Sequence, residues 1–434
     1  MRRTWRALSA ALGLVASLVI TSGCTDGNES DVRARSTTVA ADNAPPSGIC
    51  QVSANQDCFR IDTGQWVSAH RGSDAQGFIL LDIGGPGYAP VDTDVVENSL
   101  PAALKKYSIV KIFEPWVGQE LFPKCQTYFA ELSWSVPGAK DPGGCIDFVS
   151  DFAQPPLDGP VKEISRRLDA KLAGIATFSF GSTRTREIWP LLRPNGTLLV
   201  VQPAPTPALS IERILTLRAE ATWKALDGLR SRGCPQPSSC ATIDQVRARL
   251  AARTMDKQWS RTGTEMSLFV IGSVADTERY RDVLMKLFTG VAYSSTELAD
   301  LHRVAMSVSH SLGPETALTS NAGYRAAMCQ AYGAPGRIVT KDPLELAYRA
   351  QVGPCGESTS TYTSRPAPPP TRSCLVTTNA DPVIPRALLN TSADFAKADS
   401  LTYTSTIHGW PASDIARLAL PDTSRPSCTY VKSQ

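Results

Sequence analysis

The chain has 434 residues, 42% of them hydrophobic and 20% charged, which is enough to bury one large core and a second lobe. Its 44 basic and 41 acidic residues give a net charge of +3. Three of the basic residues are Arg2, Arg3 and Arg6, so the rest of the chain carries 41 charges of each sign. A balanced chain gives no electrostatic reason to expect nucleic acid as a partner.

The N-terminus has the pattern of a secretory signal, residues 1–23. A basic start precedes the mainly apolar run at 7–20, which is shorter than the ~20 residues that span a bilayer. The sequence TSGC at 21–24 resembles the lipobox of bacterial lipoproteins, although the usual leucine is Thr21 here. The resemblance implies cleavage before Cys24 and lipidation of that cysteine, which would anchor the protein to the outer face of the bacterial cell membrane. The alternative is plain secretion, with Cys24 removed or idle.

The cysteine content also suits an exported chain, because disulfides form in oxidising compartments. Eleven cysteines are present, and setting Cys24 aside leaves ten, which allows up to five disulfides. Their order suggests sequential pairs such as Cys50–Cys58, Cys125–Cys145 and Cys234–Cys240. The sequence alone leaves the connectivity open. Zinc binding is the competing interpretation, but no C-x-x-C or H-x-x-x-H spacing is present, so we expect no metal site.

The polar stretch at 24–48 reads as a flexible tether, with the fold beginning near Cys50. Short apolar runs then alternate with helical stretches such as 385–398. The runs that we expect to be strands lie at residues 77–83, 107–115, 172–178, 196–205, 373–381 and 400–407. Such alternation predicts an α/β fold with a mostly parallel sheet and helices on both faces.

A second type of pattern begins after the fourth apolar run. From residue 206 to about 351 the sequence has helical periodicity with charged outer faces. Residues 356–373 follow, with four prolines that ordinary helices and central strands do not accommodate. We therefore expect a mainly helical cap at 206–366, inserted into an α/β core made of 49–205 and 367–434.

Functional groups in a parallel sheet collect in the loops beyond the carboxyl ends of the strands. Ser179 and Asp381 each follow a predicted strand, and His408 follows the last one. Acyl transfer needs a nucleophile, a base and a carboxylate that orients the base, and the chain order Ser, Asp, His is that of α/β-hydrolases. The sequence predicts these three residues as the catalytic set. The alternatives are an ordinary tight turn at Ser179 and turn chemistry at Asp381.

Only four histidines are present. His70 precedes the first clear core strand, and His302 and His310 lie in the predicted helical cap, where an exposed helix face is the simpler explanation. His408 is the one that follows a strand near the end of the chain, with Gly409 beside it to let the loop turn. We therefore expect His408 to be the base.

Four segments resemble the proline iminopeptidase and tripeptidyl aminopeptidase group of α/β-hydrolases. They are LLDIGGPG at 80–87, IVKIFEPWVGQELFPKC at 109–125, NADPVIP at 379–385 and IHGW at 407–410. The similarity spans about residues 77–205 and 373–410. It implies an α/β-hydrolase fold, an oxyanion hole made by the backbone amides of Gly85 and Phe180, and removal of short peptides from free N-termini.

The chain departs from the group's pattern at several positions. Thr177 replaces the first glycine of the G-x-S-x-G elbow, which is tolerable only if a neighbour is small. Trp116 stands where the group has arginine, with Glu114 in place of its aspartate, so we expect a structural ion pair to be lost. Ile384 replaces a threonine of the acid loop, and residues 201–203 replace the usual L-D-G.

Three functions remain open at this point. The first is an exported serine hydrolase that acts as an aminopeptidase on peptides, through an acyl-enzyme. Its amine-binding carboxylate would come from the cap, with the candidates Glu212, Glu220, Glu265 and Glu278. The second is an envelope esterase or lipase with the same triad and a small acyl substrate. The third is an inactive binding lipoprotein of the same fold. No cofactor is expected, because dinucleotide and phosphate-loop fingerprints are absent.

Overall fold

The computed structural model describes most of the chain after the expected tether. The described residues are 50, 53, 55–86, 94–118, 124–125, 128, 140–150, 152–192, 195–254, 261–274, 276–310, 317–337, 339–353, 355, 362, 370, 372–389, 399–403, 405, 408–421 and 427–430. The expected signal peptide at 1–23, Cys24 and the tether at 24–48 lie outside them. Ala44–Gln434 forms one compact unit by its internal contacts. The domain boundaries after residues 205 and 366 stay predictions.

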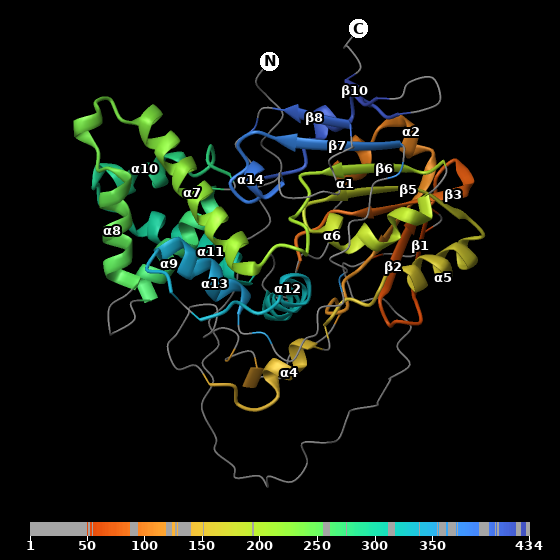
Figure 1. Ribbon diagram of the computed structural model, residues 1–434, viewed down its shortest axis with the longest axis horizontal. Coiled ribbons are helices and arrows are strands. Elements are labelled where there is room, and N and C mark those ends of the chain that lie inside the picture. The colour runs from red at the N-terminus through yellow and green to blue at the C-terminus, as the bar shows by residue number, and fades with distance from the viewer. Residues whose placement is uncertain are drawn as a thin grey trace. The chain divides into compact units, whose positions relative to one another are not determined.

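Within the described residues, one sheet of eight strands organises the structure (Figure 1). Its spatial order is β1-β2-β4-β3-β5-β6-β7-β8. The strands are β1 (Gln56–Arg60), β2 (Trp66–His70), β3 (Asp74–Asp82), β4 (Tyr107–Ile112), β5 (Lys171–Phe178), β6 (Thr197–Val201), β7 (Arg372–Thr378) and β8 (Asp399–Tyr403). All neighbours from β4 to β8 are parallel. This confirms the expected α/β-hydrolase fold with a mostly parallel sheet.

Strands β1 and β2 were not predicted from the sequence. They pair antiparallel with each other, and β2 joins the sheet by pairing antiparallel with β4. Both strands are five residues long and include polar side chains such as Gln56 and Ser68. An edge hairpin faces water on part of its surface, so it lacks the continuous apolar run that marks a central parallel strand.

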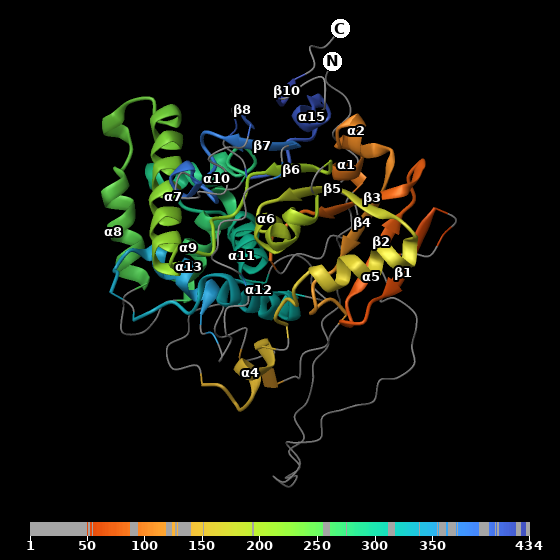
Figure 2. The same cartoon turned by 45° about the vertical axis from the view of Figure 1, so that its right-hand side comes forward.

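The central strands are apolar on both faces because helices cover both sides of the sheet. Along β3, Phe78 and Leu80 pack into one buried cluster, whereas Ile79 and Leu81 pack into the cluster on the opposite face. Figure 2 shows the two helical layers. The first layer is formed by α5 (Asp158–Leu168) and the 3₁₀ helix η1 (Arg186–Leu192), and the second by α1 (Asp94–Ser99), α2 (Ala102–Lys105) and α15 (Ala412–Ile415).

The chain between β6 and β7 is mainly helical, as the periodicity predicts. Its helices are α7 (Ile211–Gly233), η2 (Pro237–Ser239), α8 (Ile243–Thr254), α9 (Arg261–Val274), α10 (Arg281–Thr289), α11 (Ser295–His310), α12 (Ala317–Tyr332) and α13 (Pro343–Val352). We call this set the cap. Ser210 caps α7 by accepting a hydrogen bond from the Arg213 amide, and Asp342 caps α13 in the same way. None of the described helices is long and apolar enough to cross a membrane.

Five disulfides hold the ends of local segments together. Three match the sequential pairs named from the sequence, Cys50–Cys58, Cys125–Cys145 and Cys234–Cys240. The other two are Cys329–Cys355, which ties α12 to the segment after α13, and Cys374–Cys428, which ties β7 to the C-terminal segment. Disulfides of this number are typical of proteins in oxidising, extracytoplasmic compartments.

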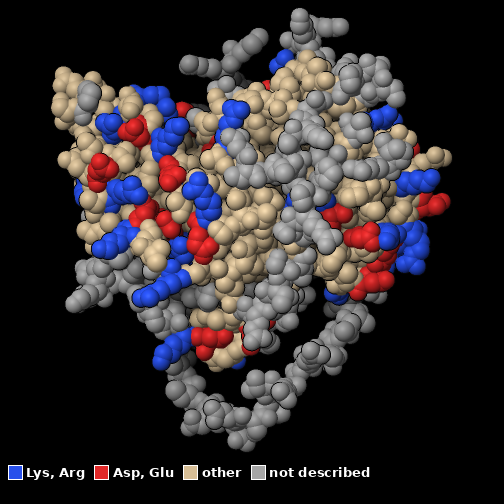
Figure 3. All heavy atoms as spheres, viewed as in Figure 1, with Lys and Arg blue, Asp and Glu red and all other residues tan. Residues whose placement is uncertain are grey.

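The remaining described elements are short. They are α4 (Cys145–Ser150), α6 (Gly181–Thr185), α14 (Arg386–Leu389) and the two-stranded sheet of β9 (Leu418–Ala419) and β10 (Thr429–Tyr430). The expected helix at 385–398 is described only over α14. On the face seen in Figure 3, basic and acidic side chains of the described residues are interspersed, as the balanced composition implies.

Helix α12 is one of the elements through which the cap packs against the core. Gln330 makes two hydrogen bonds of 2.8 Å with the backbone of Gln154, one to its N–H and one to its carbonyl. Gly323 lies against the indole of Trp116, so close that a Cβ at this position would overlap the ring. The indole is fully buried. A residue without a side chain is therefore required where α12 crosses the loop after β4.

Gly323→Ala should lower the free energy of unfolding by about 1–3 kcal/mol, because the added methyl group forces Trp116 or α12 to shift. Urea denaturation followed by circular dichroism would measure this loss. The matched control is Gly228→Ala inside α7, where the nearest atom to an added Cβ is the flexible end of Arg232 at 3.4 Å. The control should gain stability by roughly 0.5–1 kcal/mol through helix propensity. An unchanged free energy of unfolding in Gly323→Ala would contradict the close packing of α12 against Trp116.

Candidate active site

Ser179 lies at the end of β5, in a sharp turn that leads into α6. Its φ of 51° falls in the left-handed region, which is rare for a residue other than glycine. The turn is held on both sides by backbone hydrogen bonds of 3.0 Å. The Ser179 N–H donates to the Val201 carbonyl, and the Ser179 carbonyl accepts from the Ala204 N–H. A serine held in this way is presented beyond the sheet, as in a nucleophile elbow.

The elbow accommodates Thr177 because its partner across the turn is glycine. A Cβ at Gly181 would lie 2.7 Å from Thr177 Oγ1 and closer still to the Asp82 carbonyl oxygen. Thr177 is fully buried between Asp82 of β3 and Val200 of β6, and its Oγ1 has no hydrogen-bond partner. The expectation that a small neighbour offsets Thr177 is therefore met by Gly181.

His408 connects Ser179 to Asp381. His408 Nε2 lies 3.1 Å from Ser179 Oγ, and His408 Nδ1 lies 2.7 Å from Asp381 Oδ2. The imidazole also packs against the ring of Phe178, with a centroid distance of 4.9 Å. The structure thus brings together the three residues that the sequence predicts as the catalytic set, from the ends of β5, β7 and β8.

Asp381 is held as a carboxylate despite its burial. Its Oδ1 accepts hydrogen bonds from the N–H groups of Val383 at 2.7 Å and Ile384 at 2.9 Å. Burial alone would raise the pKa of the Asp381 carboxyl, but the charge and hydrogen bond of His408, with these two backbone bonds, lower it below its usual value. An ionised Asp381 fixes the His408 ring with Nδ1 as the donor, which leaves Nε2 free to accept a proton from Ser179.

The glycine-rich loop after β3 packs directly against the elbow. Gly84 has a φ of 66°, and a Cβ there would lie 2.6 Å from the backbone nitrogens of Phe180 and Gly181. Within the described part of the chain, the amides of Gly85 and Phe180 donate no hydrogen bond. An oxyanion hole requires backbone donors that are not already used, so these two amides stay candidates for one. Gly87 of the same motif lies outside the described residues.

A buried charge cluster contacts this loop, since the Gly84 N–H donates to the Asp82 carboxylate. The Arg184 guanidinium of α6 lies 3.4 Å from an Asp82 carboxylate oxygen and 3.5 Å from one of Glu114. Trp116 Nε1 also donates to Glu114. Positions 114 and 116 are thus joined by a hydrogen bond in place of an ion pair, as the substitution of Trp116 implies, and Arg184 supplies the cation for Glu114 from a different element. Burial lowers the pKa of Arg184, but the charges of Asp82 and Glu114 outweigh this effect. The pKa is raised overall, so the guanidinium stays charged.

Gln202 is a second residue whose role the sequence analysis missed. It is fully buried at the end of β6 with a φ of 46°. Its Oε1 accepts from the Thr378 N–H at 3.3 Å, and its Nε2 donates to the Tyr403 hydroxyl at 3.0 Å. That hydroxyl donates to the Gly409 carbonyl, next to His408. Gln202 thereby links three strand ends, a role that its departure from the L-D-G pattern could have signalled.

The other candidate residues lie elsewhere. His70 is exposed and lies 3.3 Å from Glu97, while the side chains of His302, His310 and Glu265 are outside the described set. Glu212 accepts a hydrogen bond from the Gly336 N–H, which lowers the pKa of its carboxyl, and Glu278 is exposed.

Glu220 is the one candidate carboxylate placed near the acid loop. It lines a cavity of about 460 Å³ between α7 and α14, together with Asp381 and Arg386. Neither Ser179 nor His408 lines this cavity, so we do not take it for the space over Ser179. Among the described residues, no group of three or more acidic, histidine or cysteine side chains is arranged to hold a metal.

No protein-family model matches the chain, and no curated protein matches it. Several solved structures are similar. Esterase E22 has 13% identity and a TM-score of 0.40 over 81% of this chain and 92% of that chain. A proline iminopeptidase of Mycobacterium smegmatis has 15% identity and a TM-score of 0.36 over 81% and 91%. An epoxide hydrolase from hot-environment metagenomes has 11% identity and a TM-score of 0.35 over 82% and 93%. These similarities are too distant to transfer an activity.

Arg184→Met should lower the free energy of unfolding by about 3–5 kcal/mol, because it leaves the buried carboxylates of Asp82 and Glu114 without their cation. Urea denaturation would measure the change, with the exposed Arg166→Met on α5 as the control, expected within about 0.5 kcal/mol of the parent. A loss below about 1 kcal/mol for Arg184→Met would contradict a supporting role for the cluster.

Proposed function

We propose that the protein is a serine hydrolase that works through an acyl-enzyme. The observation that carries the proposal is the continuous chain of contacts from Ser179 Oγ through His408 to Asp381, at a serine held with a positive φ. His408 would take the Ser179 proton as the oxygen attacks the substrate carbonyl, and would then give that proton to the leaving group. Water would regenerate Ser179 by the same two proton transfers.

The amides of Gly85 and Phe180 would stabilise the negative charge that develops on the carbonyl oxygen. Backbone donors cost no reorganisation at the moment of reaction, which is why such sites contribute strongly to the rate. Gly84 supports this arrangement because its missing side chain allows the loop to approach the elbow. The proposed hydrolase therefore needs no metal or organic cofactor for its chemistry.

We propose a hydrolase of either peptides or esters, which is a broader substrate class than the aminopeptidase substrates expected from the sequence. An aminopeptidase needs a carboxylate for the substrate ammonium. Of the described candidates, Glu220 lines a cavity together with Asp381, but Ser179 does not line that cavity, so Glu220 gives this version no direct support. Glu212 and Glu278 give it no support. An esterase with the same triad needs no such carboxylate. Both versions share the acyl-enzyme, so substrates distinguish them.

A neutral fluorophosphonate probe should label the oxidised protein, and labelling should disappear in Ser179→Ala and His408→Ala. Asp381→Asn should lower turnover on the order of 10³–10⁴-fold, because the imidazole loses the partner that fixes its tautomer. A panel of aminoacyl anilides, their N-acetyl forms and acyl esters then separates the two versions. An aminopeptidase requires the free amine, whereas an esterase ignores it. A folded parent that is not labelled would refute the proposed hydrolase and favour an inactive binding lipoprotein.

We also propose that the protein is exported and lipid-anchored through Cys24. Five disulfides among the described cysteines support an extracytoplasmic location. Cys24→Ala should move the protein from the membrane fraction to the medium of a bacterial host. Equal partitioning of parent and variant would refute the anchor and leave plain secretion.

A further inference from the structure

Arg218 of α7 is a buried cation for which the described residues supply no acceptor. Its exposed fraction is 9%, and its Nε is completely buried without a hydrogen-bond partner. Nowhere in the described part of the chain does its guanidinium form a hydrogen bond or an ion pair. Two other buried arginines, Arg184 and Arg349, form ion pairs with carboxylates. An unpaired buried charge is costly, so a group from outside the chain is the natural partner.

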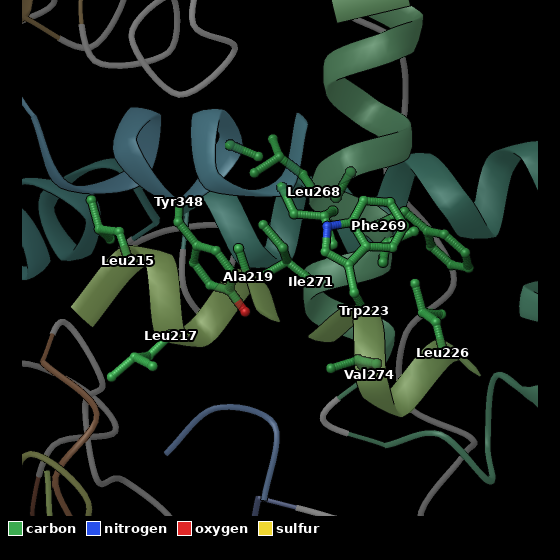
Figure 4. Packing of buried hydrophobic residues seen from close by; sticks show 14 of the residues in the cluster. Leu215, Leu217, Ala219, Trp223, Leu226, Leu268, Phe269, Ile271, Val274 and Tyr348 are labelled. Carbon is green, nitrogen blue, oxygen red and sulfur yellow. The ribbon is translucent and has the colours of Figure 1, made fainter. Parts of the chain in front are cut away.

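One side of Arg218 connects to the acid loop. Thr222, one helical turn further along α7, lies 3.1 Å from the Tyr348 hydroxyl of α13. Figure 4 shows Tyr348 beside the stretch of α7 that carries Leu217 and Ala219. Burial raises the pKa of Tyr348, the hydrogen bond with Thr222 and the charge of Arg218 lower it, and the charge of Asp381 raises it. Tyr348 therefore lies within electrostatic range of both Arg218 and Asp381, the acid of the proposed triad.

The other side connects to the elbow. The ring of Tyr332 from α12 packs edge-on against Phe180, the residue after Ser179, with a centroid distance of 6.4 Å. Its hydroxyl donates to the Pro205 carbonyl at 2.9 Å. Burial raises the pKa of Tyr332 to about 12, while Arg218 is among the groups that lower it. Leu217 and Ala219, on either side of Arg218 in α7, pack into the same buried cluster as Phe180 and Tyr332. Arg218 thus lies in the layer where the cap meets the elbow.

No described group in this layer neutralises Arg218. Tyr332 and Tyr348 are buried phenols that stay uncharged at neutral pH. The Asp381 carboxylate is already bound to His408 and to two backbone N–H groups. Among the described residues of this layer, the positive charge of Arg218 is therefore left without a counter-charge, and it can accept an anion.

We infer that Arg218 is a specificity-determining residue that binds a carboxylate of the substrate, on a part of the molecule away from the scissile bond. The planar guanidinium can donate two parallel hydrogen bonds to a carboxylate, which a point cation cannot match. The inference rests on the proposed hydrolase activity. It narrows the substrate class to acyl or peptidyl compounds that carry a free carboxylate. Compounds whose only charged group is an ammonium would not be preferred.

Two matched substrate pairs test this subsite. The first is mono-para-nitrophenyl adipate against para-nitrophenyl hexanoate, which share an acyl chain length and differ in the terminal carboxylate. The second is a short peptide against its C-terminal amide. In at least one pair, the parent should have a kcat/KM about tenfold higher for the member with the carboxylate. Arg218→Met should abolish that preference, and Arg218→Lys should keep part of it.

Arg213→Met is the matched control, because Arg213 is an exposed arginine on the same helix, and it should keep the parent's preference. A parent that prefers the carboxylate in neither pair overturns the subsite, whether or not the Arg218 variants fold. Retention of the full preference in a folded Arg218→Met protein overturns it as well. A parent that is labelled by the fluorophosphonate but shows no preference loses only the subsite, whereas an unlabelled parent refutes the hydrolase itself.

Discussion

The strained turn at Ser179 is the constraint on which the rest of the site depends. A serine with a φ of 51° can be held only where the surrounding backbone leaves no alternative. Here the hydrogen bonds with Val201 and Ala204 fix the turn, and Gly84 and Gly181 let the neighbouring segments approach it. The same close approach brings Gly84 against the backbone nitrogens of Phe180 and Gly181. Backbone geometry therefore connects the elbow with the loop of the proposed oxyanion hole.

Polar groups buried behind the elbow hold the loops in register. Arg184 ties the helix after Ser179 to Asp82 and Glu114, which lie at the ends of β3 and β4. Gln202 ties the end of β6 to β7 and to the histidine loop. These groups contact no reacting atom, but each connects strand ends whose relative positions set the distances from Ser179 to His408 and from His408 to Asp381. Buried polar groups of this kind favour one arrangement when their partners are satisfied.

The central strands and the residues of the catalytic set could be predicted from the sequence, because long apolar runs and strand-end polar residues are local signals. Ser179, Asp381 and His408 were found in this way, although their chemical roles remain proposals. The hairpin of β1 and β2 escaped because its strands carry polar residues at the edge of the sheet. Arg184 escaped because its partners come from β3 and the segment after β4, 102 and 70 residues away. Arg218 looked like any other charged residue of a cap helix, and its lack of a partner is visible only when α12 and α13 are in place.

The most direct test of an activated Ser179 is to locate the covalent adduct. The oxidised protein would be treated with a fluorophosphonate, digested and sequenced by tandem mass spectrometry. We expect a single adduct on Ser179, whereas the neighbouring Ser182 should be unmodified, because its hydroxyl already donates to the Ser179 carbonyl and accepts from the Ala204 N–H. An adduct on Ser182 or another serine, or none in a folded protein, would contradict the assembly of Ser179, His408 and Asp381 as the reactive site.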